Sequence, residues 1–299
     1  MTTKKILNKD GFLFLFKEKG YSSFYYVKQI RKILGVKKVG HAGTLDPLAE
    51  GLLIIAIGNA TKFLEYLIYD NKNYIFTIQF GNNTTTDDSE GDIIETTNNI
   101  PNKEKILSII PEYTGTIEQT PPIYSAIKVN GQRAYKLARE GKNVNISTRA
   151  INIYNLELIN FNNNQAKFNV HCSKGTYVRS LARDIAKSCN SLGHVVYLHR
   201  NKIGKYDVSN TITLENIKKI IYNENDFLEN ILIPIDNILD DISALSINDD
   251  LFQDLKHGRK IFFSEKYKDG LYRIYNNNKF YGLINIINNN INKRKLINI

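Results

Sequence analysis

Short hydrophobic runs and helically spaced hydrophobic residues alternate along the first part of the chain. Residues 12–16 and 52–57 are unbroken apolar runs of strand length, and the second is typical of a buried strand. Between them, Ser22 precedes apolar residues at helical spacing and is a suitable N-cap. We therefore expect a helix between two strands, with these residues facing inward: Val27, Ile30, Ile33 and Leu34.

The rest of the chain continues this mixture of strands and helices. From Tyr74 to Phe80, apolar residues alternate with more polar ones, as in a strand with one buried face. Further strands are expected over 151–161, 166–172 and 194–200, with helices after Asn102 and Gly175 and a linker-like segment beyond Pro234. This order predicts a mixed α/β (α+β) fold. Its parts are a domain with a central, largely antiparallel sheet at 1–239 and a small β-rich domain at 240–299.

The segment from Val39 to Gly51 combines three glycines, a histidine and an Asp-Pro pair. Glycine tolerates positive φ and the close approach of another backbone, and Pro47 disfavours the α region for Asp46. Asp46 is therefore expected on a rigid corner beside a buried strand, where a carboxylate can be desolvated and reactive. The alternative is that Asp46 only caps a turn, and spacing alone favours that alternative.

The charge of the chain points to a polyanionic partner. The 299 residues include 40 Lys and Arg against 30 Asp and Glu, a net charge of +10, and clustered cations bind nucleic acids by releasing counterions from phosphates. Lysine is abundant throughout, so clustering is more informative than the total. A cluster beside Tyr124 and Tyr135 suits unpaired RNA better than the alternative, an exposed amphipathic helix, because acidic residues are nearly absent there. Its cations are Lys128, Arg133, Lys136, Arg139, Lys142 and Arg149.

Three other charged features of the sequence bear on its function. The basic residues within 31–38 form either a solvated face or a phosphate-binding edge, and the sequence favours neither. Residues 87–92 are rich in Asp and Glu, but they lack the ligand spacing of an EF-hand calcium loop and predict a hairpin loop. Arg179 at the start of a predicted helix opposes the helix dipole, which predicts a carboxylate partner.

The cysteines and the N-terminal residues bear on the cellular compartment. Cys172 and Cys189 are far apart and lack metal-ligand spacing, so neither a disulfide framework nor a zinc site is predicted. Residues 1–10 are charge-rich, and the apolar run after them lacks the length and cleavage site of a signal peptide. No stretch reaches the ~20 apolar residues that span a bilayer. We therefore expect a soluble cytoplasmic protein with no membrane partner.

Several motifs together resemble one family. They are Gly40–Ala49, Lys72–Tyr74, Gln119–Pro122 with Tyr124–Ala126, and Gly175–Arg179. In this order and spacing they resemble the bacterial tRNA pseudouridine synthases of the TruB family, which isomerise uridine 55 in the T-loop of tRNA. The resemblance covers nearly the whole chain. It implies the pseudouridine synthase fold, a PUA-like RNA-binding domain at 240–299, and the same isomerisation.

The resemblance also implies roles for individual residues. Asp46 corresponds to the nucleophile or its equivalent, Arg179 to its ion-pair partner, and Tyr74 to the ring that stacks on the target base. The other implied substrate contacts are His41, which fills the place the base leaves, Leu198 in the pocket, Tyr177, Lys128, Arg133 and Arg139. No metal or redox cofactor is implied. These residue types suit the reaction, because breaking a glycosidic bond in a dry pocket needs an ionised carboxylate, and stacking offsets the cost of flipping the base.

The chain departs from the family pattern in two places. The family usually has Lys-Pro-x-Gly where this chain has Lys17-Glu18-Lys19-Gly20. Glu18 therefore stands in the proline position, and the loop lacks the rigidity that a proline gives. The short tail around 292–295 also lacks the usual proline. Its bacterial length still favours a monomeric enzyme that acts on the T-arm of tRNA without an obligatory protein partner.

Two other functions stay open. One is a related synthase that acts on other RNA through a guide partner, and the other is a catalytically silent RNA-folding module. The intact set of Asp46, Tyr74 and Arg179 argues against the silent module.

Overall fold

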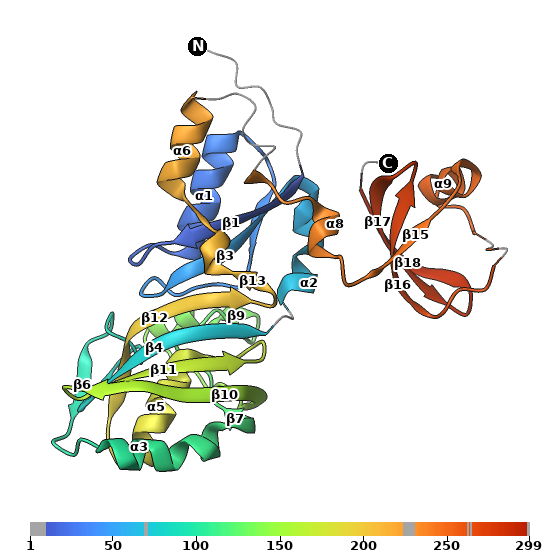
Figure 1. Ribbon diagram of the computed structural model, residues 1–299. Coiled ribbons are helices and arrows are strands. Elements are labelled where there is room, and N and C mark those ends of the chain that lie inside the picture. The colour runs from blue at the N-terminus through green and yellow to red at the C-terminus, as the bar shows by residue number, and fades with distance from the viewer. Residues whose placement is uncertain (1–9, 69–70, 224–230, 262, 264, 298–299) are drawn as a thin grey trace.

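The computed structural model describes residues 10–68, 71–223, 231–261, 263 and 265–297. Two units are visible in Figure 1, a larger one built on a ten-stranded sheet and a smaller one built on a four-stranded sheet. Nearly all of the charge-rich start of the chain, residues 1–9, lies outside the described residues. Within the described residues, no helix is long and apolar enough to cross a membrane.

The large sheet contains the six strands that the sequence predicted, with the expected approximate extents, and four shorter strands that it did not predict. They are β1 (Gly11–Lys17), β2 (Val39–Ala42), β3 (Glu50–Ile57), β4 (Lys72–Phe80), β7 (Gly115–Gln119), β10 (Arg149–Asn162), β11 (Gln165–Cys172), β12 (Gly193–Ile203), β13 (Tyr206–Asp207) and β14 (Ile212–Thr213). Their order is β14-β1-β3-β12-β4-β11-β10-β7, with β2 beside β3 and β13 beside β12. The β1–β14 and β3–β12 pairs are parallel and the others antiparallel, so the predicted, largely antiparallel sheet is confirmed.

Helices cover the β1–β3 half of the sheet on both faces. The α-helices among the described residues are α1 (Ser23–Leu34), α2 (Leu64–Ile68), α3 (Lys103–Ile109), α4 (Ala134–Arg139), α5 (Val178–Ser188), α6 (Leu214–Asn223), α8 (Ile235–Ile238) and α9 (Asp249–Lys256). One buried cluster joins α1 and α6 to β1 and β3, and a second joins α8 and the α2 region to their other face. This double coverage explains why both strands are unbroken apolar runs.

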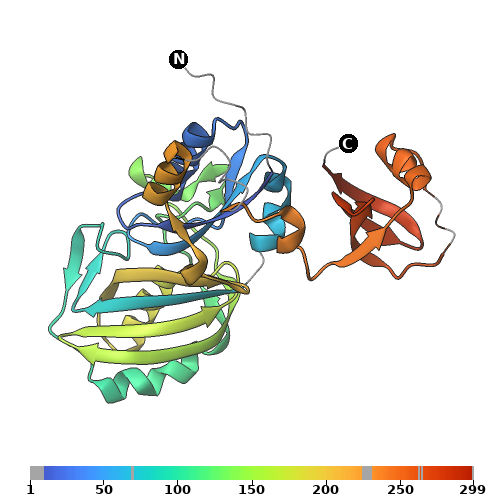
Figure 2. The ribbon, with the colours of Figure 1, turned by 45° about the horizontal axis from the view of Figure 1, so that its top comes forward.

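The other half of the sheet is covered differently. Helices α3 and α5 pack on one face of β4, β10 and β11, and Figure 2 shows α5 behind these strands and α3 along their lower edge. Helix α1 begins as expected, because the Ser22 side chain accepts the Tyr25 N–H at 3.2 Å. The Asn102 side chain caps α3 in the same way. Two small ribbons extend from the sheet, β5 (Asn82–Thr84) with β6 (Ile93–Thr96), and β8 (Lys128–Val129) with β9 (Gln132–Arg133).

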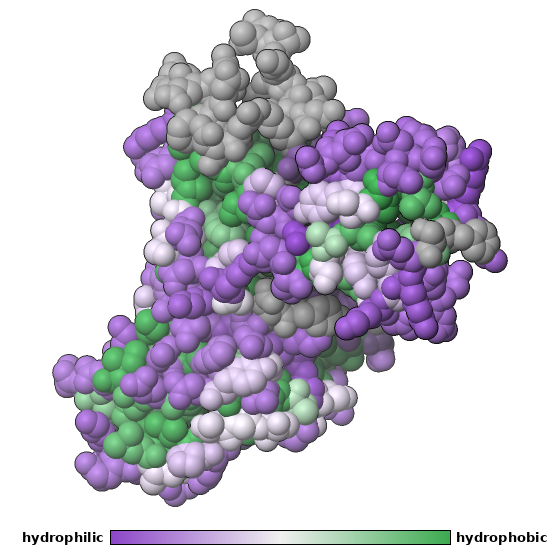
Figure 3. Space-filling model, turned by 45° about the vertical axis from the view of Figure 1, so that its right-hand side comes forward, coloured by the Kyte–Doolittle hydropathy of each residue, from purple (hydrophilic) through white to green (hydrophobic). Residues whose placement is uncertain are grey.

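The smaller unit is a β-rich body of four strands and α9. Its strands are β15 (Ser243–Ser246), β16 (Gly270–Asn276), β17 (Lys279–Ile287) and β18 (Asn290–Leu296). The stretch beyond Pro234 is not an extended linker, because it forms α8 and buries Ile235 and Ile238 against the large unit. The predicted boundary at residue 240 falls between α8 and β15, and the assignment of a separate PUA-like domain stays a prediction. Figure 3 shows hydrophilic side chains over much of both units, with smaller hydrophobic areas between them.

Candidate active site

The loop between β2 and β3, residues 43–49, is hereafter called the Asp46 loop. Its apolar residues Leu45, Leu48 and Ala49 are buried, whereas the Asp46 side chain keeps 32% of its surface exposed. The Ser23 hydroxyl accepts the Leu45 N–H at 2.8 Å and donates to the Leu45 carbonyl at 3.0 Å. The buried neighbours therefore fix the loop while the carboxylate stays accessible.

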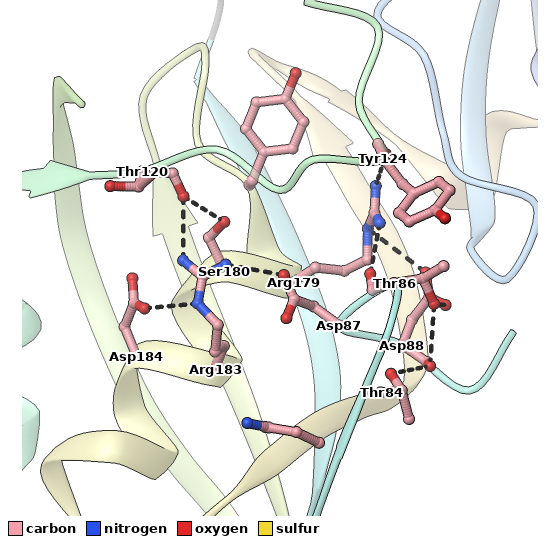
Figure 4. Close-up of polar contacts among 12 residues, drawn as sticks. Thr84, Thr86, Asp87, Asp88, Thr120, Tyr124, Arg179, Ser180, Arg183 and Asp184 are labelled. Atoms are coloured by element: carbon pink, nitrogen blue, oxygen red, sulfur yellow. Dashed lines mark hydrogen bonds and ion pairs between the residues drawn. The ribbon is translucent and has the colours of Figure 1, made fainter. Parts of the chain in front are cut away.

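Arg179 is the ion-pair partner of Asp46. The Nε atom of Arg179 donates to Asp46 Oδ2 at 2.8 Å, and the arginine side chain is only 3% exposed. Its other nitrogens donate to the carbonyls of Thr86 and Tyr124 at 2.7 and 2.9 Å, as Figure 4 shows. The expected carboxylate partner of Arg179 is thus confirmed, and the suggestion that Asp46 only caps a turn is wrong.

A second carboxylate lies against the same arginine. Asp88 Oδ2 is 3.5 Å from Arg179 Nε, and its side chain is 3% exposed. Asp88 lies in the loop of the β5–β6 hairpin, so the hairpin predicted for residues 87–92 is confirmed. The main-chain N–H of Glu90 and the Thr86 hydroxyl bind its Oδ1 atom. A buried guanidinium needs a compensating charge, and here two carboxylates share it.

Sequence reasoning missed Asp88, and one helical turn further along α5 it missed a second arginine. Arg183 donates to Asp87 Oδ2 at 2.9 Å, to Asp184 Oδ1 at 3.0 Å and to the Thr120 carbonyl at 3.1 Å. Figure 4 shows Arg179 and Arg183 on the same helix, contacting the same hairpin loop. Burial raises the pKa of Asp87, and the Arg183 charge acts against this rise. An acidic run opposite arginines four positions apart was the signal that could have revealed this contact.

Tyr74 and Leu198 lie in the buried cluster that also contains the apolar residues of the Asp46 loop. Burial raises the pKa of the Tyr74 hydroxyl, while the Arg200 guanidinium acts in the opposite direction. Arg200 faces Tyr74 across β12 and β4 and donates to the Gly43 carbonyl at 3.1 Å. Arg200 thus links Tyr74 to the Asp46 loop, a contact that the sequence did not reveal.

One glycine permits the parallel contact between β3 and β12. Gly51 has φ +109°, and a Cβ atom there would lie 2.4 Å from the Arg200 carbonyl oxygen. Arg200 also donates from Nε to the Leu52 carbonyl at 2.9 Å. His41 on β2 is partly buried, and burial together with the nearby Arg200 charge lowers its pKa. A neutral imidazole is therefore favoured near the Asp46 loop.

Lys17 at the end of β1 is a further residue, to which the sequence assigned no role in the site. It is fully buried, and its Nζ atom donates to the carbonyls of Glu18 and Pro47, each at 3.2 Å, and to that of Ala49. Burial lowers its pKa to about 8, and the Asp46 charge opposes that shift. The side chain thus ties β1 to the Asp46 loop.

Tyr177 and the three basic substrate candidates lie outside the ion-pair network. Gln119 holds the Tyr177 main chain, accepting its N–H at 2.8 Å and donating to its carbonyl at 3.1 Å. Lys128 and Arg133 face each other across the β8–β9 ribbon, and Arg139 ends α4. All three are exposed, so the basic cluster spans a ribbon and a short helix and is not a single amphipathic helix. Their contact with RNA stays a prediction.

The site combines the accessible Asp46 carboxylate with the buried Arg179 that holds it. The ring of Tyr74 belongs to the same buried cluster as the apolar residues of the Asp46 loop. Within the described residues, no group of three or more His, Cys, Asp or Glu side chains is placed to hold a metal ion. Cys172 and Cys189 are buried free thiols, and burial raises the pKa of Cys172 to about 11. A protonated thiol is a poor nucleophile, so Asp46 is the better candidate.

Solved structures define the class of fold. A Cbf5–Nop10–Gar1 complex is similar with a TM-score of 0.69 at 22% identity, covering 95% of this chain and 84% of that chain. An H/ACA ribonucleoprotein bound to a substrate RNA containing 2'-deoxyuridine is similar with a TM-score of 0.68 at 21% identity, covering 93% and 78%. The chain has the pseudouridine synthase fold.

Sequence comparison identifies the family. The N-terminal domain of the TruB family pseudouridylate synthases matches residues 31–178, the C-terminal domain of tRNA pseudouridylate synthase B matches 179–240, and the C-terminal domain of pseudouridine synthase II TruB matches 243–297. The tRNA pseudouridine synthase B of Rickettsia felis is 46% identical over 84% of this chain and 74% of its own length. That of Ehrlichia ruminantium is 44% identical over 86% and 88%. The chain belongs to the TruB family of pseudouridine synthases.

Proposed function

We propose that this chain alone converts uridine 55 in the T-loop of tRNA to pseudouridine, with Asp46 as the nucleophile or its equivalent. The supporting observation is the Asp46–Arg179 pair, in which a buried arginine holds an accessible carboxylate within a loop of buried apolar residues. The arginine thereby holds in one orientation the carboxylate that the reaction needs. The similarity to relatives named tRNA pseudouridine synthase B supports tRNA as the substrate.

The reaction rearranges bonds within one nucleotide. The bond between C1′ and N1 breaks, the base rotates, and C1′ bonds to C5; C5 loses a proton and N1 gains one, so no atoms are added or removed. Tyr74 stacks on the flipped base, Leu198 and Tyr177 line its pocket, and His41 fills the place that the base leaves. A neutral His41, which its lowered pKa favours, suits insertion between stacked bases.

We assign the binding of tRNA to a wider surface than the one that carries out the isomerisation. Lys128, Arg133 and Arg139 contact phosphates of the T-arm, and the β-rich unit from residue 240 acts as a PUA-like RNA-binding domain. The net charge of +10 supports a polyanionic substrate. The enzyme acts as a cytoplasmic monomer without an obligatory protein partner, and the step requires no cofactor.

The alternative of guided action on other RNA has some support, because the similar solved structures are ribonucleoprotein or multiprotein complexes. The identity of 44–46% to proteins named tRNA pseudouridine synthase B favours the stand-alone enzyme. The alternative of a silent RNA-folding module has no specific observation in its favour.

One experiment separates these functions. Purified wild-type protein and Asp46→Asn are incubated with unmodified tRNA alone, and pseudouridine is mapped by sequence position. We expect wild type to modify position 55, and Asp46→Asn to bind tRNA within a few-fold of wild type but form no product, because the substitution keeps side-chain size and removes the charge. Near-wild-type turnover by Asp46→Asn would overturn the role of Asp46. Product only with an added guide RNA would favour the guided alternative.

A further inference from the structure

The hydroxyl of Tyr26 holds the residue that replaces the family's proline. Tyr26 lies in α1 and its side chain is fully buried. Its hydroxyl oxygen accepts the Glu18 N–H at 2.9 Å, and the hydroxyl donates toward Glu18 Oε2 at 3.4 Å. Burial raises the pKa of Tyr26 to about 12, so the group stays protonated at neutral pH. A single hydroxyl thus contacts both the main chain and the side chain of Glu18.

Glu18 begins the connection between β1 and α1, residues 18–22, and both ends of this connection are bonded to the Asp46 loop. At its start, Lys17 Nζ donates to the Pro47 carbonyl at 3.2 Å. Within it, the Gly20 N–H donates to the same carbonyl at 2.8 Å. At its end, the Ser23 hydroxyl is bonded to the main chain of Leu45. The residues on either side of Asp46 are therefore held by the segment that Tyr26 holds.

We propose that Tyr26 is a positioning residue for the isomerisation, because it restrains Glu18 in place of a proline ring and thereby keeps the Asp46 loop in position. A proline at this point would restrict φ and remove the N–H group. The Tyr26 hydroxyl satisfies that N–H and restrains the same stretch of backbone from outside. The proposal rests on the proposed function of Asp46, since Tyr26 acts only through the loop.

The first test is Tyr26→Phe, which removes the hydroxyl and keeps the ring. We expect the single-turnover rate on tRNA to fall roughly five-fold, the effect of one typical hydrogen bond, while the Kd for tRNA stays the same. The matched control is Tyr25→Phe, because the Tyr25 hydroxyl makes no hydrogen bond to any described residue while its ring packs against Tyr26. A wild-type rate in Tyr26→Phe would overturn the proposal.

The second test is rescue by Glu18→Pro. Lys17 lies in a strand, the conformation that a residue before proline prefers, so the backbone before position 18 suits the substitution. In Tyr26→Phe/Glu18→Pro, position 18 has no N–H to leave unpaired, and the ring of the new proline restrains the backbone there. We therefore expect a single-turnover rate within about two-fold of wild type. Glu18→Pro alone should be slower than the double variant, because the buried Tyr26 hydroxyl loses its partner. A double variant as slow as Tyr26→Phe would overturn the proposal.

A third measurement does not depend on catalysis. Amide hydrogen exchange at Gly20 and Ala49 reports on the bonds that these residues donate to Pro47 and Asp46 carbonyls. We expect faster exchange at both in Tyr26→Phe and recovery in the double variant; unchanged exchange in Tyr26→Phe would overturn the proposal. If wild type formed no pseudouridine, the proposed function would fail, whereas the exchange data would still decide whether Tyr26 holds the loop.

Discussion

The Nε atom of Arg179 lies 2.8 Å from Oδ2 of Asp46, although the two residues are 133 positions apart in the chain. The same guanidinium donates to two main-chain carbonyls, so its plane is fixed before any substrate binds. A point charge on a flexible stem could pair with Asp46 but could not occupy all of these positions together. The geometry of the arginine, as well as its charge, therefore positions the carboxylate.

Arg179→Lys tests this distinction. Lysine keeps the positive charge beside Asp46 and Asp88 but leaves the Thr86 and Tyr124 carbonyls without a donor, so we expect a loss of about 1–3 kcal/mol in unfolding free energy. The single-turnover rate should fall at least about ten-fold, because Asp46 is no longer held in one orientation. Urea unfolding and single-turnover assays measure the two effects. A variant with wild-type turnover would show that charge alone is sufficient.

The Arg183–Asp87 contact predicts a coupled effect one turn further along α5. Asp87 has φ +59°, a conformation that asparagine also tolerates, so Asp87→Asn removes the charge without straining the backbone. We expect Asp87→Asn and Arg183→Gln each to destabilise the fold, and the double variant to lose less than the sum of the two by about 1 kcal/mol. Denaturant unfolding of the four proteins gives the coupling energy.

Loss of the Arg183–Asp87 contact should also slow the reaction. Asp87 follows Thr86, whose carbonyl accepts from Arg179, so loosening the hairpin loop moves one acceptor of the arginine. Strictly additive losses of stability in the double variant would contradict the assigned contact. Arg183→Lys is the matched control, because it keeps a charge near Asp87.

The sequence predicted the sheet, the helices near Asp46 and the pairing of Asp46 with Arg179. Apolar runs and caps are local, so β1, β3 and α1 could be read from short windows. Asp46 and Arg179 are far apart in the chain. Their pairing was predicted because an arginine at a helix start needs a carboxylate partner, and because the motifs that contain these two residues resemble those of one family.

Other contacts could not be predicted because they depend on long-range packing. Asp88 lies in an acidic run that locally indicates only a loop, and its burial follows from how the hairpin lies on α5. Tyr26 faces Glu18 only because α1 packs against β1 and β3. The role of Arg200 depends on the parallel contact of β12 with β3, for which no single window carries a signal.

The basic cluster predicts a change in the salt dependence of binding. Each phosphate contact contributes about −0.7 to −0.9 to the slope of log affinity against log salt, so Lys128→Gln, Arg133→Gln and Arg139→Gln together should flatten it by roughly two to three. Turnover of saturating tRNA should persist, because among the described residues no hydrogen bond or ion pair joins these three side chains to Asp46 or Arg179. Filter binding at several salt concentrations measures the slope.

The matched control removes three exposed lysines from α3 and α5: Lys103, Lys105 and Lys187. None of these three lysines belongs to the β8–β9 ribbon or to α4, so the control should change the slope by less than one phosphate contact. Equal slopes for the two triple variants would mean that the β8–β9 ribbon and α4 carry no specific phosphate contacts.

Lys17 predicts a dependence on pH. Its pKa is lowered to about 8 by burial, so it loses its charge in the folded protein as the pH rises through about 8 and then has fewer protons to donate to the Asp46 loop. We expect the single-turnover rate to fall over this range.

The free energy of unfolding changes in the opposite direction as the pH rises. Between about pH 8 and pH 10.5 the unfolded chain binds a proton that the folded chain has released, so this group's contribution to unfolding free energy increases with pH and is lost as the pH falls through about 8.

Lys17→Met separates this titration from others in the enzyme. The variant has no charge to lose, so its rate should be low already at neutral pH and show no fall near pH 8, and its stability should lack the rise that begins there. Single-turnover rates and urea unfolding of both proteins between about pH 6.5 and about pH 9.5 show whether the titration belongs to Lys17. A fall in rate near pH 8 that persisted in Lys17→Met would assign that titration to another group and would leave Lys17 as a charged residue throughout the range.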